Sequence, residues 1–201
     1  MTVPDPVRQQ AGARPEAPAL ATPSATWSWA DLDRRVDAAA RALGGRERVA
    51  VRAETSPVLV VLVLAALRSG TLLVPLSMRW AAPAVADALA RLGLDAVYAE
   101  AELSGVETAP LAALLGTASS TVGPAVDLPA DRPFTVVHTS GSTGAPKAVL
   151  HTVGNHVWSA RGVIDVLSVG AESRWLLDLP LYHVGGLGVV VRCALAGAAV
   201  V

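Results

Sequence analysis

The segment FTVVHTSGSTGAPKAVLHT, residues 134–152, decides how the rest of the chain is interpreted. Its centre, TSGSTGAPK at residues 139–147, places hydroxyl side chains, two glycines, a proline and a lysine in an otherwise apolar region. Both flanks are rich in β-branched and apolar residues, which predicts strands at 134–138 and 148–152 joined by a polar loop. Such a loop is either an ordinary surface hairpin or a binding site for a phosphate chain.

The residue types in the loop suit phosphate binding. Gly141 and Gly144 lack the Cβ atoms that would keep a phosphate away from the backbone amides, and successive amides in such a turn form an anion-binding nest. The spacing matches neither G-x-x-x-x-G-K-(S/T) nor G-x-G-x-x-G, so composition alone leaves a hairpin without a ligand as an equal alternative. The hydroxyl donors and the positive charge come from Thr139, Ser140, Ser142, Thr143 and Lys147.

The composition is that of a compact, well-buried domain. Apolar residues make up 52% of the 201 residues and charged residues only 16%, below the usual charged share of about 25%. The net charge of −1 gives no reason to expect nucleic acid or an anionic membrane as a partner. The single cysteine, Cys193, excludes an internal disulfide and fits a reducing compartment.

We expect neither a secretory signal nor a membrane span. The N-terminal MTVPDPVRQQ lacks an apolar core, and the longest apolar run, residues 57–67, falls well short of the ~20 residues that a span requires. Arg192 interrupts the apolar run at residues 185–201. We therefore expect a soluble, cytoplasmic protein.

The first hundred residues alternate between helical and strand patterns. In SWADLDRRVDAAARAL, Ser28 and Asp31 have the spacing of a capping box, and apolar residues recur at helical intervals. Ser56 followed by Pro57 begins a second helix, which stops at Gly70. The expected strands are RVAV at 48–51, TLLVPL at 71–76 and DAVYA at 95–99, with a further helix between Pro83 and Gly93.

This alternation predicts an α/β fold of layered, parallel-rich sheets with helices on both faces. The first two dozen residues, rich in Pro and Ala, are expected to wrap the surface, and residues 103–130 show little pattern. After the loop we expect a helix at about 155–167, an apolar strand within 174–183, a helix at 188–196 and a strand beginning at 198.

The complete loop string resembles the phosphate-binding loop of the adenylate-forming (AMP-binding) acyl-CoA ligase superfamily. That pattern, (S/T)-(S/G)-G-(S/T)-(S/T)-G-x-P-K, fits residues 139–147 at every fixed position, and SWADLDRRVDAAARAL, RVAV, SPVLVVLVLAALRSGTLLVPLS and LPLYHVGGL follow in the family's order. The resemblance covers nearly the whole chain. It implies a partial large N-terminal domain, with a first α/β unit at about 25–100, a second unit carrying the phosphate loop at about 131–201, and no C-terminal small domain.

Within this superfamily, the part after the loop looks like the o-succinylbenzoate–CoA ligases of menaquinone synthesis. The similar pieces are HT-x-GNH-x-x-SA at 151–160, WLLDLPLYHVGGL at 175–187 and R-x-x-L-x-G at 192–197. The resemblance implies that a small-molecule carboxylate attacks the α-phosphorus of ATP, bound with Mg²⁺, to give an acyl-adenylate. Coenzyme A then displaces AMP. ATP, Mg²⁺ and coenzyme A are thus the implied cofactors of the complete enzyme.

The resemblance also assigns roles to residues. Lys147 would balance the phosphate charge, and His183 would lie beside the carboxylate pocket; these two are the candidate catalytic residues. Arg192 matches a basic position that could meet a second substrate carboxylate, although a structural salt bridge with Asp178 is an equal alternative. The β- and γ-phosphates would be held by Thr139, Ser140, Gly141, Ser142, Thr143, Gly144 and Lys147.

For the remaining candidates we favour structural roles. His151 and His156 are expected to be structural, the histidines are too dispersed for a metal cluster, and Cys193 is expected to be an inert core residue. The family's later segments are missing from the 201 residues, so we expect a truncated chain that is inactive alone. The alternatives are a non-catalytic remnant or subunit that needs a separate C-terminal chain, and an amino-acid adenylation domain that feeds a carrier protein; a homo-oligomer is left open.

Overall fold

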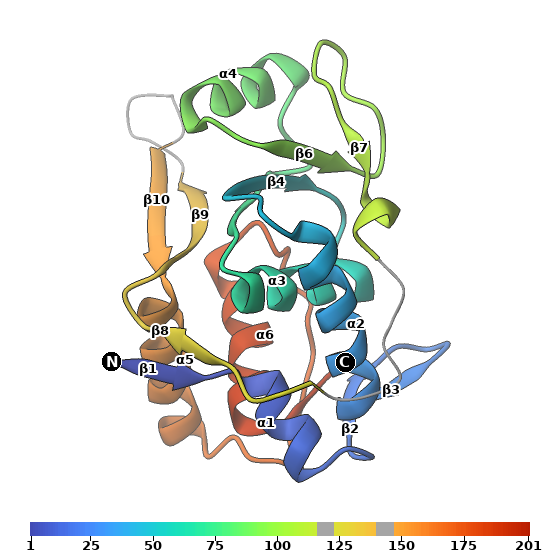
Figure 1. Cartoon of the computed structure of the whole chain (residues 1–201), viewed down its shortest axis with the longest axis vertical. Coiled ribbons are helices and arrows are strands. Elements are labelled where there is room, and N and C mark those ends of the chain that lie inside the picture. The colour runs from blue at the N-terminus through green and yellow to red at the C-terminus, as the bar shows by residue number, and fades with distance from the viewer. Residues whose placement is uncertain (116–122, 140–146) are drawn as a thin grey trace.

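The computed structural model describes residues 1–115, 123–139 and 147–201. Its main feature is a six-stranded sheet of order β10-β9-β5-β4-β6-β7, in which every neighbouring pair is parallel except β9 and β10 (Figure 1). The strands are β4 (Arg48–Arg52), β5 (Leu72–Pro75), β6 (Ala96–Ala99), β7 (Ala109–Pro110), β9 (Pro133–Thr139) and β10 (Lys147–Thr152).

A second sheet has four strands, in the order β11-β12-β2-β3. These are β11 (Arg174–Trp175), β12 (Ala199–Val200), β2 (Pro18–Ala21) and β3 (Thr26–Ser28). A small antiparallel pair joins β1 (Thr2–Pro4) to β8 (Asp127–Pro129). The predicted division into two α/β units is not tested by this arrangement and stays a prediction.

Helices cover both faces of the six-stranded sheet, as predicted. Val49 and Val51 of β4 pack in the main core with α2, α3 and α6, whereas Ala50 packs with α4 on the opposite face. This alternation follows from the two-residue period of a strand. The helices are α1 (Pro6–Ala13), α2 (Trp29–Leu43), α3 (Pro57–Ser69), α4 (Ala82–Leu92), α5 (Val153–Leu167) and α6 (Val184–Ala196), with a 3₁₀ turn η1 (Leu111–Leu114).

The residues predicted to begin and end the helices α2 and α3 do so in the structure. The Asp31 amide donates to Ser28 Oγ at 3.2 Å and the Ser28 amide donates to Asp31 Oδ2 at 3.2 Å, which completes a capping box. The Leu59 amide donates to Ser56 Oγ at 3.3 Å at the start of α3. Gly70 ends that helix in the left-handed conformation, with φ of 86°, a conformation that glycine adopts without steric cost.

The N-terminal segment differs from the prediction, because it does not wrap the surface. Residues 6–13 form α1, which Asp5 caps through its side chain, and Val7 and Ala11 are buried in the main core. Residues 18–21 form an inner strand of the second sheet. The segment is thus part of the core.

Two helices start earlier than predicted, and one predicted strand is shorter. Thr152 caps α5, which begins at residue 153. Helix α6 begins at residue 184 because Gly186 lets its first turn approach the preceding turn; a Cβ atom there would lie 2.5 Å from the carbonyl oxygen of Pro180. Of the expected strand within 174–183, only residues 174–175 pair.

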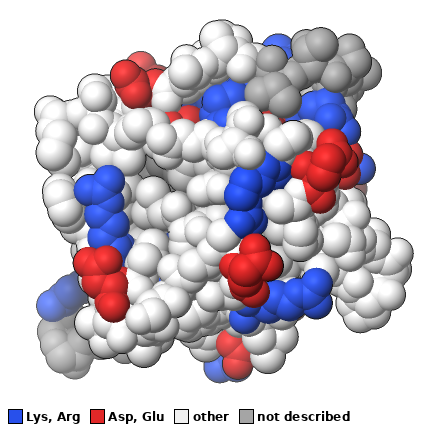
Figure 2. Space-filling model, turned by 90° about the horizontal axis from the view of Figure 1, so that it is seen from below, with Lys and Arg blue, Asp and Glu red and all other residues white. Residues whose placement is uncertain are grey.

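The molecular surface carries charges of both signs. Figure 2 shows Lys and Arg side chains interspersed with Asp and Glu side chains over the face seen from below. Among the described residues, the structure contains no helix that combines the length and apolar character needed to cross a membrane.

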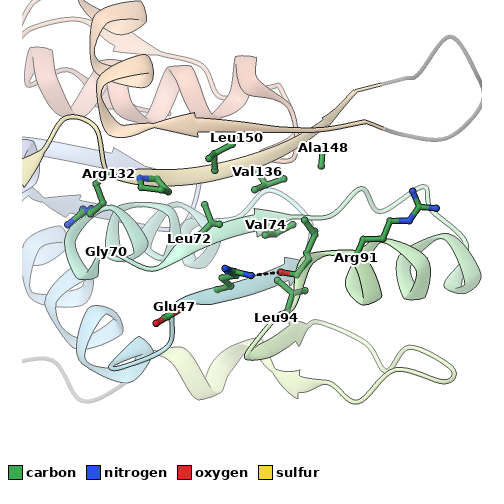
Figure 3. Close-up of a pocket in the computed structure, with 13 residues that line it drawn as sticks. Glu47, Gly70, Leu72, Val74, Arg91, Leu94, Arg132, Val136, Ala148 and Leu150 are labelled. Carbon is green, nitrogen blue, oxygen red and sulfur yellow. Dashed lines mark hydrogen bonds between the residues drawn. The ribbon is translucent and has the colours of Figure 1, made fainter.

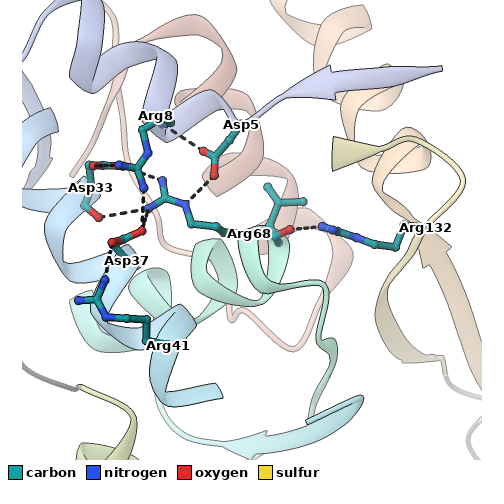
Figure 4. Close-up of polar contacts among 8 residues, drawn as sticks. Asp5, Arg8, Asp33, Asp37, Arg41, Arg68 and Arg132 are labelled. Carbon is teal, nitrogen blue, oxygen red and sulfur yellow. Dashed lines mark hydrogen bonds and ion pairs between the residues drawn. The ribbon is translucent and has the colours of Figure 1, made fainter. Parts of the chain in front are cut away.

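A buried ionic cluster joins α1, α2 and α3 (Figure 4). Arg68 Nε lies 2.7 Å from Asp5 Oδ2, and Arg68 Nη2 lies 2.6 Å from Asp33 Oδ1. Arg8 Nη2 lies 2.7 Å from Asp37 Oδ1, and Arg8 Nη1 lies 3.2 Å from Asp33 Oδ2. Burial raises the pKa of Asp33, while the Arg68 and Arg8 guanidinium groups oppose that shift. The cluster ties three helices to one another through paired charges.

Replacing Arg68 tests this cluster. Arg68→Met leaves the carboxylates of Asp5 and Asp33 buried without their main partner, so the free energy of unfolding should fall by about 3–5 kcal/mol. Arg91→Met is the matched control because Arg91 pairs with Asp87 on the exposed side of α4, where the loss should be under about 1 kcal/mol. Urea unfolding followed by circular dichroism measures both. Equal losses would contradict the structural role of the cluster.

Candidate functional site

Strands β9 and β10 bring the two ends of the predicted phosphate loop together. Thr139 is the last residue of β9 and Lys147 is the first residue of β10, and they are paired opposite each other in the antiparallel register. Both are exposed. Lys147 is also the only lysine in the chain. The loop residues Ser140, Gly141, Ser142, Thr143 and Gly144 lie outside the described residues, so their predicted roles stay predictions.

His138, the residue before Thr139, packs against Trp80 of the segment after β5, and Arg52 of β4 holds that segment. The rings of Trp80 and His138 meet edge to face, with centroids 4.8 Å apart. Arg52, at the end of β4, donates to the carbonyl oxygens of Met78 at 3.0 Å and Trp80 at 3.4 Å. Burial lowers the pKa of His138. These contacts support the strand that leads into Thr139.

His156 is a buried residue that links α5 to β9. Its Nε2 atom lies 2.8 Å from Thr135 Oγ1, and its ring packs against Phe134 with centroids 5.1 Å apart. The ring of His151 lies 5.5 Å away. Burial, together with the charge of His151, lowers the pKa of His156 to about 4. These contacts confirm the structural role expected for His156.

The two candidate substrate residues lie on the second part of the fold. His183 is the exposed N-cap residue of α6, and its ring centroid lies 4.6 Å from that of Tyr182. Arg192 lies two turns further along α6, with its guanidinium carbon 4.2 Å from the centroid of the Trp175 ring. Among the described residues Arg192 forms no ion pair, and Asp178 is exposed, so the alternative salt bridge is not formed.

The predicted site residues therefore fall into two groups. One group is Thr139 and Lys147, where β9 ends and β10 begins, and the other is His183 and Arg192 on α6. Within the described ranges, no hydrogen bond, ion pair or ring contact connects the two groups. Sequence reasoning missed Trp175 as the partner of Arg192, since no spacing rule relates a strand residue to a helix residue seventeen positions later.

A groove lies on the outer face of the six-stranded sheet, beside α4 (Figure 3). Its volume is about 570 Å³, and Arg48, Arg91 and Arg132 lie among the residues around it. None of the predicted site residues that the structure describes lines this groove. Its apolar lining residues include Leu72, Val74, Leu94, Val136, Ala148 and Leu150.

Neither a metal cluster nor a reactive thiol is found in the described part of the chain. No group of three or more His, Cys, Asp and Glu residues there is arranged to hold a metal ion. Burial raises the pKa of the Cys193 thiol to about 12, which keeps it protonated and unreactive. Thr139 and Lys147 provide no carboxylate, so we assign no protein ligand to the Mg²⁺ that would accompany ATP.

The fold and the loop sequence agree with a family match over almost the whole chain. The family model described as AMP-binding enzyme matches residues 7–201. The chain therefore belongs to the AMP-binding enzyme family. Its α/β fold is that of the large N-terminal domain of adenylate-forming enzymes, as the similar structures below also show.

Among curated relatives, the 2-succinylbenzoate–CoA ligase of Salmonella typhimurium is 35% identical over 193 residues, which cover 92% of this chain and 41% of that protein. The enzyme of the same name from Escherichia coli is 32% identical and covers 85% of this chain and 38% of that protein. A feruloyl-CoA synthase of Amycolatopsis is 32% identical, with 92% and 40% covered. The chain thus spans about two fifths of these relatives' length.

Solved structures are similar over the complete chain. A structure of o-succinylbenzoate coenzyme A synthetase (MenE) from Bacillus subtilis, in complex with ATP and magnesium ion, has a TM-score of 0.87 at 25% identity, and the match covers 100% of this chain and 57% of that one. A substituted E. coli MenE with bound OSB-AMS has a TM-score of 0.85 at 29% identity, covering 100% of this chain and 45% of that one.

The buried His156 predicts a pH dependence of stability. Its pKa is about 4 in the folded chain against 6.5 for an ordinary histidine, so the unfolded state binds more protons between these values. Its contribution to stability is complete above pH 6.5 and is lost as the pH falls towards 4, by about 3 kcal/mol.

His156→Gln, which keeps a polar group near Thr135, should lack this loss of stability, so the stability difference between the two proteins should change as the pH falls from 6.5 to 4. Urea unfolding at pH values from 7.5 to 4 measures it. The acidic residues remain in both chains, so their contributions cancel in the difference. Parallel profiles for the two proteins would contradict the buried, neutral state of His156.

Proposed function

We propose that the chain provides the phosphate-binding N-terminal portion of an ATP-dependent acid–thiol ligase. The observation that carries this proposal is the hairpin of β9 and β10, which places Lys147 opposite Thr139 at the two ends of a loop with the full adenylate-forming sequence. The complete enzyme would join a carboxylate to coenzyme A through an acyl-adenylate. The family match and the relatives named as CoA ligases support this proposal.

In the proposed mechanism, the hairpin binds the triphosphate while the substrate carboxylate attacks the α-phosphorus. The amides and hydroxyls of the loop hold the β- and γ-phosphates, and Lys147 balances their charge before pyrophosphate leaves. AMP then leaves as the thiol of coenzyme A forms the thioester. Positioning and charge neutralisation supply most of the protein's contribution to such a reaction.

We propose o-succinylbenzoate, an intermediate of menaquinone synthesis, as the substrate. His183 would lie beside the carboxylate that reacts, and Arg192 would bind the second carboxylate. The absence of an acidic partner for Arg192 in the described part of the chain favours an anionic ligand there. The feruloyl-CoA synthase relative leaves an aryl monocarboxylate as the second candidate.

Experiments can distinguish the proposed ligase from two further alternatives. An amino-acid adenylation domain would activate an amino acid in preference to o-succinylbenzoate. A non-catalytic remnant or subunit would need a separate C-terminal chain for any exchange activity, and nothing in the relatives supports such a chain.

Because Lys147 is the only lysine, its environment can be measured directly in the 201-residue chain. Mg-ATP and inorganic triphosphate at millimolar concentration should slow acetylation of Lys147 by N-hydroxysuccinimidyl acetate several-fold, as measured by peptide mass spectrometry. AMP, which lacks the β- and γ-phosphates, should protect little. The α-amino group of Met1 is the internal control, and equal protection of both amines would contradict phosphate binding at the hairpin.

ATP–pyrophosphate exchange tests the activity and the substrate. The chain alone should show background exchange, and the chain completed with the remaining residues of the Salmonella relative should exchange with o-succinylbenzoate. Lys147→Ala in that completed enzyme should slow exchange by roughly a hundredfold, the scale for losing one charge-stabilising group. A preference for ferulate or for an amino acid would reject o-succinylbenzoate as the substrate. Exchange above background by the 201-residue chain alone would contradict the expectation that this chain is inactive without the rest of the enzyme.

A further inference from the structure

The side chain of Arg192 is partly desolvated but has no acidic partner. Its Nε–H donor is buried and has no hydrogen-bond partner in the described part of the chain. The described contact of its guanidinium is the ring of Trp175, 4.2 Å away. A buried donor without an acceptor costs free energy, and a desolvated positive charge without a counter-ion costs more.

Stacking on Trp175 compensates only part of this cost. A tryptophan face attracts a guanidinium by about 0.5–2 kcal/mol, more where water is excluded. The guanidinium carbon lies over the ring, and a cation–π contact of this kind does not use up the N–H donors of the guanidinium. Those donors are the part of arginine that binds a carboxylate with two parallel hydrogen bonds.

The ring of Trp175 is itself held firmly. The Val201 amide donates to the Trp175 carbonyl at 2.9 Å, and the Leu177 amide donates to the Val201 carbonyl at 2.8 Å, so the residue after β12 holds the backbone that follows Trp175. The side chain packs against the apolar cluster of Val169, Val189, Cys193, Ala198 and Val200. A firmly held ring therefore restricts where the guanidinium of Arg192 lies.

The direction of the Arg192 side chain is also defined. A Cβ atom built on Gly188 would lie 3.7 Å from Arg192 Nη2, so the guanidinium lies over the turn of α6 that precedes Arg192. This is the usual direction of long side chains on a helix, towards the N-terminus. His183 caps that end of α6. The stacked guanidinium thus points along the helix towards the proposed carboxylate site.

We infer that Trp175 is a positioning residue that fixes Arg192 for the second carboxylate of an aryl dicarboxylate. The inference deepens the proposed function and depends on it. A flexible arginine would bind a monocarboxylate and a dicarboxylate nearly equally, since it could pair with whichever anion is present. An arginine whose position is restricted favours the ligand whose second carboxylate reaches that position, because little rotamer entropy is then lost on binding.

The test is an NMR titration of the 201-residue chain, observing the arginine side-chain Nε–Hε signals. Arg192→Leu assigns the Arg192 signal. The probes are o-succinylbenzoate and its two single-carboxylate analogues, o-butanoylbenzoate and benzoylpropanoate. Trp175→Leu should move the Arg192 signal out of the ring-current field, and should weaken o-succinylbenzoate binding roughly tenfold, the scale of a desolvated cation–π contact. Binding of the single-carboxylate analogue that lacks the Arg192-bound group should change little.

The chain contains a matched control for this substitution. Arg161 lies over Trp158 at 4.9 Å on the exposed side of α5, so Trp158→Leu removes a second tryptophan–arginine stack without touching the proposed site. This variant should bind all three acids like the original chain. Trp175→Phe, which keeps an aromatic face, should recover most of the lost affinity. In an Arg192→Leu background, Trp175→Leu should have no further effect on binding.

The outcomes separate the positioning role from the proposed function. Unchanged o-succinylbenzoate affinity in Trp175→Leu, or an equal loss in Trp158→Leu, would overturn the positioning role and leave the ligase proposal standing. A further loss from Trp175→Leu in the Arg192→Leu background would show that Trp175 acts by itself, which also overturns it. Failure of the original chain to bind any of the three acids would overturn the proposed carboxylate site, and the positioning role with it.

Discussion

The fold depends on the pairing of Arg68 with the buried carboxylates of Asp5 and Asp33. A charge in a protein interior is tolerated only when partners surround it, so these three residues must meet wherever the chain places them. Their meeting fixes the N-terminal helix α1 and the end of α3 against α2. The carbonyl of Leu67, in the last turn of α3, accepts a hydrogen bond from Arg132, the residue before β9. The strand that leads to the predicted phosphate loop is therefore aligned with the same cluster.

Local sequence rules predicted most of the fold because most elements carry their own signals. Ser28 with Asp31, and Ser56 with Gly70, mark helix boundaries that the structure confirms. Helix α1 was missed although Asp5 and Pro6 form a start signal, because a short Pro- and Ala-rich segment with a buried arginine has no clear amphipathic pattern. What keeps Arg8 buried is a pair of carboxylates on α2. Such distant partners cannot be found from local periodicity.

The candidate site also has one part that local sequence patterns predict and one part that they do not. The strands on either side of residues 139–147 were predictable, since alternating apolar residues and a polar loop define a hairpin by themselves. The surroundings of Arg192 could not be predicted from the sequence. Sequence alone left an ionic partner and a ligand as equal alternatives, and the structure places an aromatic ring there instead. That contact arises because β11 pairs with β12 next to α6, which is a consequence of topology and not of any spacing in the sequence.

One apolar core connects the two parts of the proposed site. Val137 of β9, Val157 of α5 and Val190 of α6 belong to the same cluster of buried residues, so the hairpin and α6 are held by close packing, which resists displacement. Val189 and Cys193 of α6 face a second cluster, which Trp175 joins. Helix α6 is thus apolar on two sides, and the charge of Arg192 lies between them with an aromatic ring as its partner. Under the proposed function, this positive charge is available to an incoming anion because no described acidic side chain pairs with it.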